Sequence, residues 1–165
     1  MILYHGSIVK VENPMIIKTE QGRDFGYGFY TTEIKEQAIR WAIRKRLIAR
    51  KKGHNEKAIV SIYDFNENAR SELKILHYPE PTLEWLDMIC ACRQNPGYQH
   101  GYDIVIGKIA NDNVGETVSY VAAGVMRRED ALERLKFQKI NNQFCFNTER
   151  ALNYLNYTGY EEFEG

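Results

Sequence analysis

Two aromatic side chains, Tyr30 and Trp41, are spaced so that they could share one binding cleft. Tyr30 lies near the end of the chain's short run of strand-forming residues at 29–31, and Trp41 follows eleven positions later among apolar residues at helical spacing. A helix that packs back across its own strand would bring both rings together, where they could hold a flat heterocycle. The alternative, and the commoner role for a helix tryptophan, is a place in the core on the buried helix face.

Three further residues that could take part in binding or catalysis, His5, Gly6 and Ser7, lie near the start of the chain. Residues 1–5 have the composition of a strand, and His5-Gly6 ends it with backbone groups that can be presented to a ligand. A lone histidine at such a place is more often structural. The same dipeptide at His100-Gly101 precedes a strand instead of ending one, so we treat it as unrelated.

A polar residue, Gln143, lies near the start of the segment NNQFCFN, residues 141–147, which is predicted to be a strand. Its amide can both donate and accept hydrogen bonds. The structural alternative is that it only satisfies backbone groups at the strand end. Thr148 is the predicted N-cap of a last helix, 149–155, in which Glu149 is the first residue.

Basic residues accumulate on the helix that carries Trp41, which is predicted for residues 33–52 with Thr31 or Thr32 as N-cap and Gly53 at its end. After Glu36 this segment has no acidic residue. Its basic residues are Arg40, Arg44, Lys45, Arg46, Arg50, Lys51 and Lys52. Most such runs are solvated helix faces, but a basic surface beside a cleft could bind phosphate groups.

The remaining segments alternate between strands, helices and turns. A turn is expected at residues 21–23. Strands are predicted for 58–65, 73–76 and 103–109, helices for 82–92, with Thr82 as N-cap, and 128–135, and a short helix or strand for 117–123. These predicted elements are short and separated by polar or proline-containing breaks.

Composition limits the class of protein. The 165 residues fit a single domain, 1–165, with 22 basic and 22 acidic side chains, so a nucleic-acid or membrane partner would need a local patch. Three cysteines lack CxxC spacing, and four histidines are scattered far from them. This pattern favours reduced thiols over a disulfide framework or a zinc site. No stretch has the pattern of a signal peptide or the length of a membrane span, so we expect a cytoplasmic protein.

Three motifs in order carry a family resemblance: HGS after the first strand, GFYTT leading into a helix with its aromatic residue, and a late strand opening on a polar residue. This combination resembles the ADP-ribosyltransferase fold, in its diphtheria-toxin-like and poly-ADP-ribose-polymerase-like branch with a His, Tyr, Glu triad. The segments LYHGS, DFGYGFYTT, YDIVIG and NQFCFNTERAL are most similar to an uncharacterised bacterial family of that clan, often found as toxins beside a small antitoxin. The resemblance covers nearly the whole chain.

The resemblance implies an α+β fold with a split mixed β-sheet flanked by helices, and NAD as a substrate bound in its central cleft. His5 would bind the nicotinamide-side ribose, the Gly6 backbone would pair with the carboxamide, and the Ser7 hydroxyl would assist. Tyr30 and Trp41 would hold the nicotinamide ring between them.

The main departure from the family pattern is Gln143, which stands in the place of the catalytic glutamate. A glutamine keeps an acceptor for the ribose 2′-hydroxyl but carries no charge to oppose the positive charge that develops as nicotinamide leaves. Transfer of a single ADP-ribose fits this site, whereas chain elongation does not. Glu149 is the alternative source of a carboxylate, although it falls after the strand.

The function implied is that of an NAD-dependent mono-ADP-ribosyltransferase, the toxin of a bacterial toxin–antitoxin pair, that modifies a protein or a nucleic acid. Two alternatives stay open. Water could be the acceptor, which would make the protein an NAD glycohydrolase. The missing glutamate also fits a non-catalytic module that binds NAD or another protein.

Overall fold

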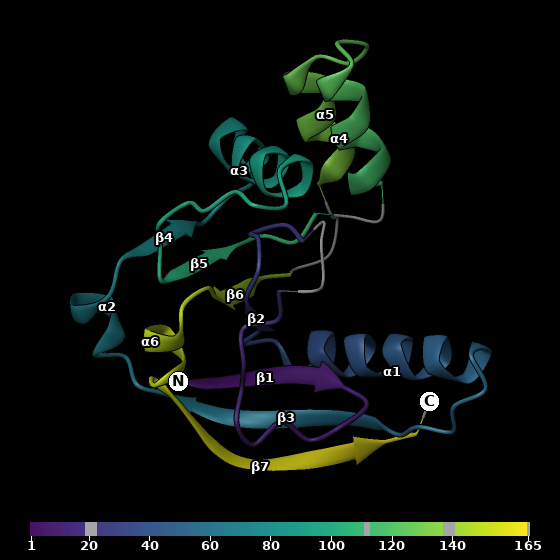
Figure 1. Ribbon diagram of the computed structural model, residues 1–165, viewed down its shortest axis with the longest axis vertical. Helices are drawn as coiled ribbons and strands as arrows, with labels where there is room; N and C mark the ends of the chain where they lie inside the picture. Colours follow the sequence, from purple (N-terminus) through teal and green to yellow (C-terminus); the bar gives the residue numbers. More distant parts are fainter. Residues whose placement is uncertain (19–22, 111–112, 137–140, 165) are drawn as a thin grey trace.

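Two β-sheets form the framework of the protein in a computed structural model, which describes residues 1–18, 23–110, 113–136 and 141–164 (Figure 1). Within these residues the first sheet is antiparallel, in the order β1-β3-β7: β1 (Ile2–Ser7), β3 (Ala58–Phe65) and β7 (Leu155–Phe163). The second has the order β2-β6-β5-β4 and is mixed: β2 (Phe29–Thr31), β6 (Gln143–Phe146), β5 (Ile104–Gly107) and β4 (Ile75–Tyr78). The protein is therefore α+β with a mixed sheet, as expected.

Helices flank both sheets. Figure 1 shows α1 (Lys35–Lys51) along the first sheet, whereas α3 (Leu83–Gln94), α4 (Val114–Ala122) and α5 (Arg128–Leu135) gather beyond the second. Two single-turn helices, α2 (Ala69–Glu72) and α6 (Glu149–Leu152), lie in connections. No helix in the described part of the chain has both the length and the apolar character needed to cross a bilayer.

The alternation of side chains along β1 decides which residues face which layer. Tyr4 packs with Ala38 and Ala42 on the α1 side, whereas Leu3 is buried against the second sheet with Phe29. His5 follows Leu3 by two positions and therefore points between the two sheets. This places a polar ring at the edge of an otherwise apolar interface.

Gly6 allows β1 and α1 to approach closely. A Cβ atom at this position would lie 2.1 Å from the carbonyl oxygen of Ala38 and 2.9 Å from the backbone nitrogen of Ala42. Backbone atoms of a helix cannot yield as a flexible side chain would, so only glycine fits here. The contact fixes the distance between β1 and the helix that carries Trp41.

Several predicted elements are confirmed. The strand at 58–65 and the helix at 128–135 have the predicted bounds, and the segment near 117–123 is a helix, α4. The hydroxyl oxygens of Thr82 and Thr148 accept hydrogen bonds from the backbone N–H groups of Trp85 and Ala151 at 3.3 and 3.1 Å, as N-caps do. Gly53 follows α1 with φ +84°, a conformation suited to glycine.

The predicted N-cap of α1 is wrong. Thr31 belongs to β2, and α1 begins at Lys35 with Ile34 as its N-cap residue. The hydroxyl oxygen of Thr32 accepts instead from the N–H of Ile34 at 3.0 Å, which shapes a short turn between strand and helix. A connection therefore separates β2 from α1, where the sequence suggested direct succession.

Two further predictions need correction near the ends of elements. The last helix stops at Leu152 instead of residue 155, and the chain continues into the long strand β7. The strand predicted for 73–76 lies at Ile75–Tyr78, because Leu73 closes α2. The turn expected at residues 21–23 falls mostly outside the described residues.

Candidate functional site

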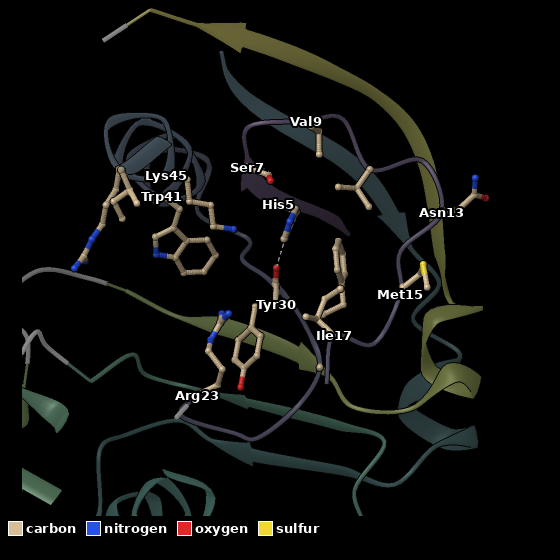
Figure 2. A pocket seen from close by; sticks show the side chains of 15 residues that line it. His5, Ser7, Val9, Asn13, Met15, Ile17, Arg23, Tyr30, Trp41 and Lys45 are labelled. Atoms are coloured by element: carbon tan, nitrogen blue, oxygen red, sulfur yellow. Dashed lines mark hydrogen bonds between the residues drawn. The ribbon is translucent and has the colours of Figure 1, made fainter. Parts of the chain in front are cut away.

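A cleft of about 760 Å³ opens between the end of β1, strand β2 and helix α1 (Figure 2). Its polar side is lined by His5, Ser7 and Lys45, and its apolar side by Phe29 and by side chains of the segment between β1 and β2. A second cavity of about 340 Å³ adjoins it. The larger volume is typical of a site for a small organic ligand or cofactor.

The two cavities share four lining residues, Arg23, Tyr30, Trp41 and Arg44. Gln143 lines the smaller cavity. The residues singled out in the sequence therefore converge on one region, although they come from β1, β2, α1 and β6. Gly6 lies in β1 between two lining residues and contributes only backbone groups.

His5 is held as a neutral ring with a defined tautomer. Its Nδ1 lies 2.7 Å from the carbonyl oxygen of Tyr30, and its ring stacks on that of Phe29 with centroids 4.2 Å apart. A carbonyl oxygen can only accept, so Nδ1 carries the hydrogen. Burial, reinforced by the nearby charge of Lys45, lowers the pKa of His5 to about 3. The Nε2 atom is therefore left as a hydrogen-bond acceptor.

The edge of β1 opens where β1 and β2 separate. Tyr4 and Thr32 exchange two backbone hydrogen bonds of 2.8 and 2.9 Å, and a continued ladder would next pair Gly6 with Tyr30. Instead, the His5 ring donates a hydrogen bond to the Tyr30 carbonyl oxygen. Backbone groups of alternate residues point to the same side, so those of Gly6 face the opening, where Lys45 Nζ donates to its carbonyl oxygen at 2.9 Å.

Tyr30 is a fixed ring in the wall of the cleft. It is 4% exposed, its hydroxyl oxygen accepts from the Phe25 N–H at 3.0 Å, and the hydroxyl donates to the Gly26 carbonyl oxygen at 2.7 Å. The Arg23 guanidinium lies over this ring, 4.0 Å from its centroid. A flat ligand that used the same face would have to displace Arg23.

Trp41 is not a core residue. It is half-buried, lines both cavities and lies outside the buried clusters of the described chain. Ala38 and Ala42 instead occupy the face of α1 that packs on the first sheet. Of the two positions considered for Trp41, in the core or in a cleft, the structure shows the position in the cleft.

Gln143 opens β6 as predicted and is 4% exposed. Its Nε2 lies 3.4 Å from Oδ2 of Asp24, a carboxylate that is 6% exposed. Oδ1 of Asp24 accepts from Nε and Nη2 of Arg93 at 2.9 and 2.7 Å. Sequence reasoning missed Asp24 and Arg93 as site residues, because they are 69 positions apart and no local pattern connects them.

A family profile matches nearly all of this chain. The profile of a family described as a protein of unknown function, DUF3990, matches residues 1–157. The chain belongs to the DUF3990 family. Comparison with curated proteins and with solved structures finds no match. The DUF3990 match spans every lining residue of both cavities, so the site lies within the family's own region and not in an appended segment.

Glu149 does not approach the site of this DUF3990 protein. It is exposed, begins α6 after the end of β6, and lines neither cavity. The carboxylate nearest to Gln143 in the cavity lining is that of Asp24. The carboxylate beside Gln143 therefore comes from the segment before β2 and not from Glu149.

The basic residues of α1 do not form one solvated face. Arg46 is 5% exposed, and Arg44 and Lys45 line the cleft. Arg40, Arg50, Lys51 and Lys52 are exposed away from the cleft, and Arg44 is exposed at its rim. Only part of the basic run is thus free to meet a macromolecule, while another part faces any ligand in the cleft.

Proposed function

We propose that this protein is an NAD-dependent mono-ADP-ribosyltransferase with an ADP-ribosyltransferase-like fold. The observation that carries the proposal is the convergence of His5, Tyr30, Trp41 and Gln143 on two adjoining cavities. The positions of all four, and the residue types of His5, Tyr30 and Trp41, are those that the family resemblance implies for binding and activating NAD, whereas Gln143 stands where the resemblance implies a glutamate. They come from four separate elements, β1, β2, α1 and β6.

Recognition of the nicotinamide end would use the opened edge of β1. A carboxamide has one donor and one acceptor group, which complement the carbonyl oxygen and N–H of Gly6. Lys45 holds that carbonyl oxygen in the structure, and its flexible side chain can withdraw. The ring of nicotinamide would then lie between the planes of Tyr30 and Trp41, with Arg23 displaced from Tyr30.

The reaction breaks the bond between the nicotinamide ring nitrogen and the anomeric carbon of ribose. Both electrons of that bond leave with nicotinamide, which neutralises its charged ring, and positive charge develops on the ribose. An electron pair of the acceptor forms the new bond to the anomeric carbon, and the acceptor releases its proton. Transfer is favoured by groups that bind the charged ribose more tightly than NAD itself.

His5 and Gln143 are the residues proposed to hold the ribose. The neutral His5 ring offers Nε2, and the amide of Gln143 offers Oε1, so both can accept a hydrogen bond from a ribose hydroxyl. Neither carries a charge. A site of this kind suits one transfer to a good nucleophile and gives no base for extending a chain of ADP-ribose units.

The acceptor is proposed to be a macromolecule, a protein or a nucleic acid. The exposed cations Arg40 and Lys51 lie on one side of the helix that carries Trp41, so a nucleic-acid acceptor that lies along this side of α1 would reach the cleft. The role of a toxin restrained by a small antitoxin protein stays a prediction of the resemblance. Growth arrest that depends on Gln143 would support it.

The proposal is tested with NAD labelled in its adenosine part. The purified protein is incubated with labelled NAD and cell lysate, and both released nicotinamide and label on protein or nucleic acid are measured. A transferase yields label on a macromolecule together with an equal amount of nicotinamide. Nicotinamide without labelled macromolecule selects the glycohydrolase, and calorimetric binding of NAD without nicotinamide selects the binding module. Absence of both binding and release would contradict every NAD-based function.

A further inference from the structure

We propose that Asp24 is a positioning residue for Gln143: its carboxylate fixes the Gln143 amide so that Oε1 is turned toward the bound ribose. The inference rests on the proposed function, because it names how the neutral residue of that site is held in a working orientation. Neither the sequence motifs nor the family resemblance assigns a role to Asp24. Four observations carry it.

The carboxylate of Asp24 is held from three elements. Arg93 of α3 donates twice to Oδ1, at 2.9 and 2.7 Å, and the backbone N–H of Ala110, which follows β5, donates to Oδ2 at 3.2 Å. Gln143 of β6 completes the set on Oδ2 at 3.4 Å. Because both oxygens are bound from fixed elements, the carboxylate has little freedom to turn.

The backbone beside Asp24 is fixed as well. The carbonyl oxygen of Phe25 accepts from Nε2 of His100 at 3.0 Å and from Nδ2 of Asn147 at 2.9 Å. The N–H of Phe25 donates to the hydroxyl of Tyr30 at 3.0 Å. Asp24 and the Tyr30 hydroxyl are therefore both bound to one short segment. This segment fixes the position of the Gln143 amide relative to the Tyr30 ring.

The chemistry of the contact decides the orientation of the amide. A carboxylate can only accept and an amide nitrogen can only donate, so the group of Gln143 that faces Asp24 must be its NH₂. The carbonyl oxygen Oε1 then points away from Asp24. A flipped amide would place three oxygen atoms together in a buried site, where an unpaired polar contact is costly.

The same contact suits the glutamine that this chain has where the family resemblance implies a glutamate. A glutamate at position 143 would set a second carboxylate against that of Asp24. Two carboxylates that share a buried site cannot both ionise easily. Glutamine beside Asp24 therefore gives a defined acceptor without that conflict.

The first test replaces Asp24 with asparagine. Asp24→Asn keeps the shape, but its own NH₂ can now face Gln143 and release the orientation of the amide. We expect kcat for nicotinamide release to fall about 10-fold or more while the Kd for NAD stays near that of the parent, because the lost contact acts on the reacting state. Asp87→Asn is the matched control, since Asp87 binds Arg128 through the same two guanidinium atoms, at 3.0 and 2.7 Å, on the surface. A folded Asp24→Asn variant with parental kcat would overturn the proposal.

The second test exchanges the two functional groups. Gln143→Glu alone sets the introduced carboxylate against Asp24, so the pKa of that carboxylate rises, and turnover and thermal stability both gain a pH dependence in addition to that of the parent. In the double variant Asp24→Asn, Gln143→Glu the new amide donates to the new carboxylate, so the added pH dependence disappears and turnover exceeds that of Asp24→Asn. The other charged side chains that line this cavity, Arg23, Arg44 and Arg93, are present in all variants.

Thermal stability separates this inference from the proposed function. Unfolding between pH 4 and pH 9 needs no NAD. A raised pKa in the folded Gln143→Glu variant predicts that its stability falls as pH rises through that pKa, and that Asp24→Asn abolishes the fall. If the coupling is present but the parent releases no nicotinamide, the Asp24–Gln143 contact stands and the transferase proposal fails. Identical pH profiles for Gln143→Glu with and without Asp24→Asn would overturn the inference itself.

Discussion

Nδ1 of His5 lies 2.7 Å from the carbonyl oxygen of Tyr30, at the point where β1 and β2 part. The imidazole takes the place that a backbone N–H would have in a continued ladder. It thereby keeps the carbonyl of Tyr30 satisfied while the sheets diverge and the cleft opens. One residue thus both stabilises the split between the strands and offers an acceptor to a ligand.

The neutral state of the half-buried His5 ring predicts a pH dependence of stability. Its folded pKa of about 3 lies below the ordinary value of 6.5, so the unfolded chain binds more protons between these values. Stability is fully present above about pH 6.5 and is lost as pH falls, by about 2 kcal/mol per such group between pH 7 and pH 5. In denaturant unfolding experiments, the His5→Gln variant should lack the part of this decrease in the free energy of unfolding that comes from protonation of His5.

Two other histidines serve as comparisons for that measurement. His100 also has a pKa lowered by burial, so His100→Gln should reduce the same pH dependence. His54→Gln changes an exposed residue after α1 and controls for the loss of a histidine as such. Equal pH slopes for His5→Gln and the parent would show that His5 is not held neutral.

The two tryptophans predict opposite consequences of substitution. Trp41→Ala should weaken NAD binding by about 1–3 kcal/mol, as loss of a stacking partner does, with little loss of stability because the side chain is half-buried. Trp85→Ala, which empties a site at 0% exposure in the core, should cost about 3–5 kcal/mol of stability. Calorimetric titration and thermal melting of both variants test this. A Trp41→Ala variant with parental NAD affinity would rule out stacking.

Gly6 predicts a strict packing requirement. Gly6→Ala would set a methyl group 2.1 Å from the Ala38 carbonyl oxygen, so β1 and α1 must separate, at a cost of about 3 kcal/mol. Gly115→Ala is the matched control in α4, where a Cβ meets nothing within 4 Å, and it should stabilise by about 0.5–1 kcal/mol. Denaturant unfolding measures both. A neutral Gly6→Ala substitution would mean that the close approach is not required.

The exposed cations of α1 test the class of acceptor. If a nucleic acid is modified, replacing Arg40 and Lys51 together with glutamine should lower its labelling, and the labelling should fall steeply with salt. Nicotinamide release into water should change little, because neither residue lines the cleft. Replacing Arg127 and Lys136 removes equal charge at α5 and controls for net charge. Labelling that does not respond to salt would point to a protein acceptor.

Local patterns were enough to predict the parts of the site that lie in single elements. Tyr30 was predicted in a strand and Gln143 at the start of one, and the register of β2 and β6 sets Tyr30 opposite Cys145, two positions after Gln143. His5 was expected at the end of its strand and lies within β1. The role of Trp41 could not be decided from periodicity, because a helix tryptophan at an edge of the packed face satisfies the same spacing.

Contacts between distant segments were beyond sequence reasoning. The pairing of Asp24 with Arg93, the cover of Arg23 over Tyr30 and the hydrogen bond of Lys45 to Gly6 depend on how elements pack, and none has a local signature. Strand β7 was missed for a related reason. Its residues alternate between buried or half-buried and exposed along an edge strand, and glycine and acidic residues weaken the apolar signal until pairing with β3 is known.

Gln143 is the residue on which the proposed reaction depends most, and single-turnover and steady-state release of nicotinamide by Gln143→Ala tests its role most directly. We predict that kcat falls about 100-fold or more with little change in the Kd for NAD, because the lost hydrogen bond acts in the transition state. Gln37→Ala is the control, since Gln37 is another buried amide whose bonds go to the backbone of Asn142, and it should lose stability while retaining most turnover. A folded Gln143→Ala variant that releases nicotinamide at the parental rate would contradict the account.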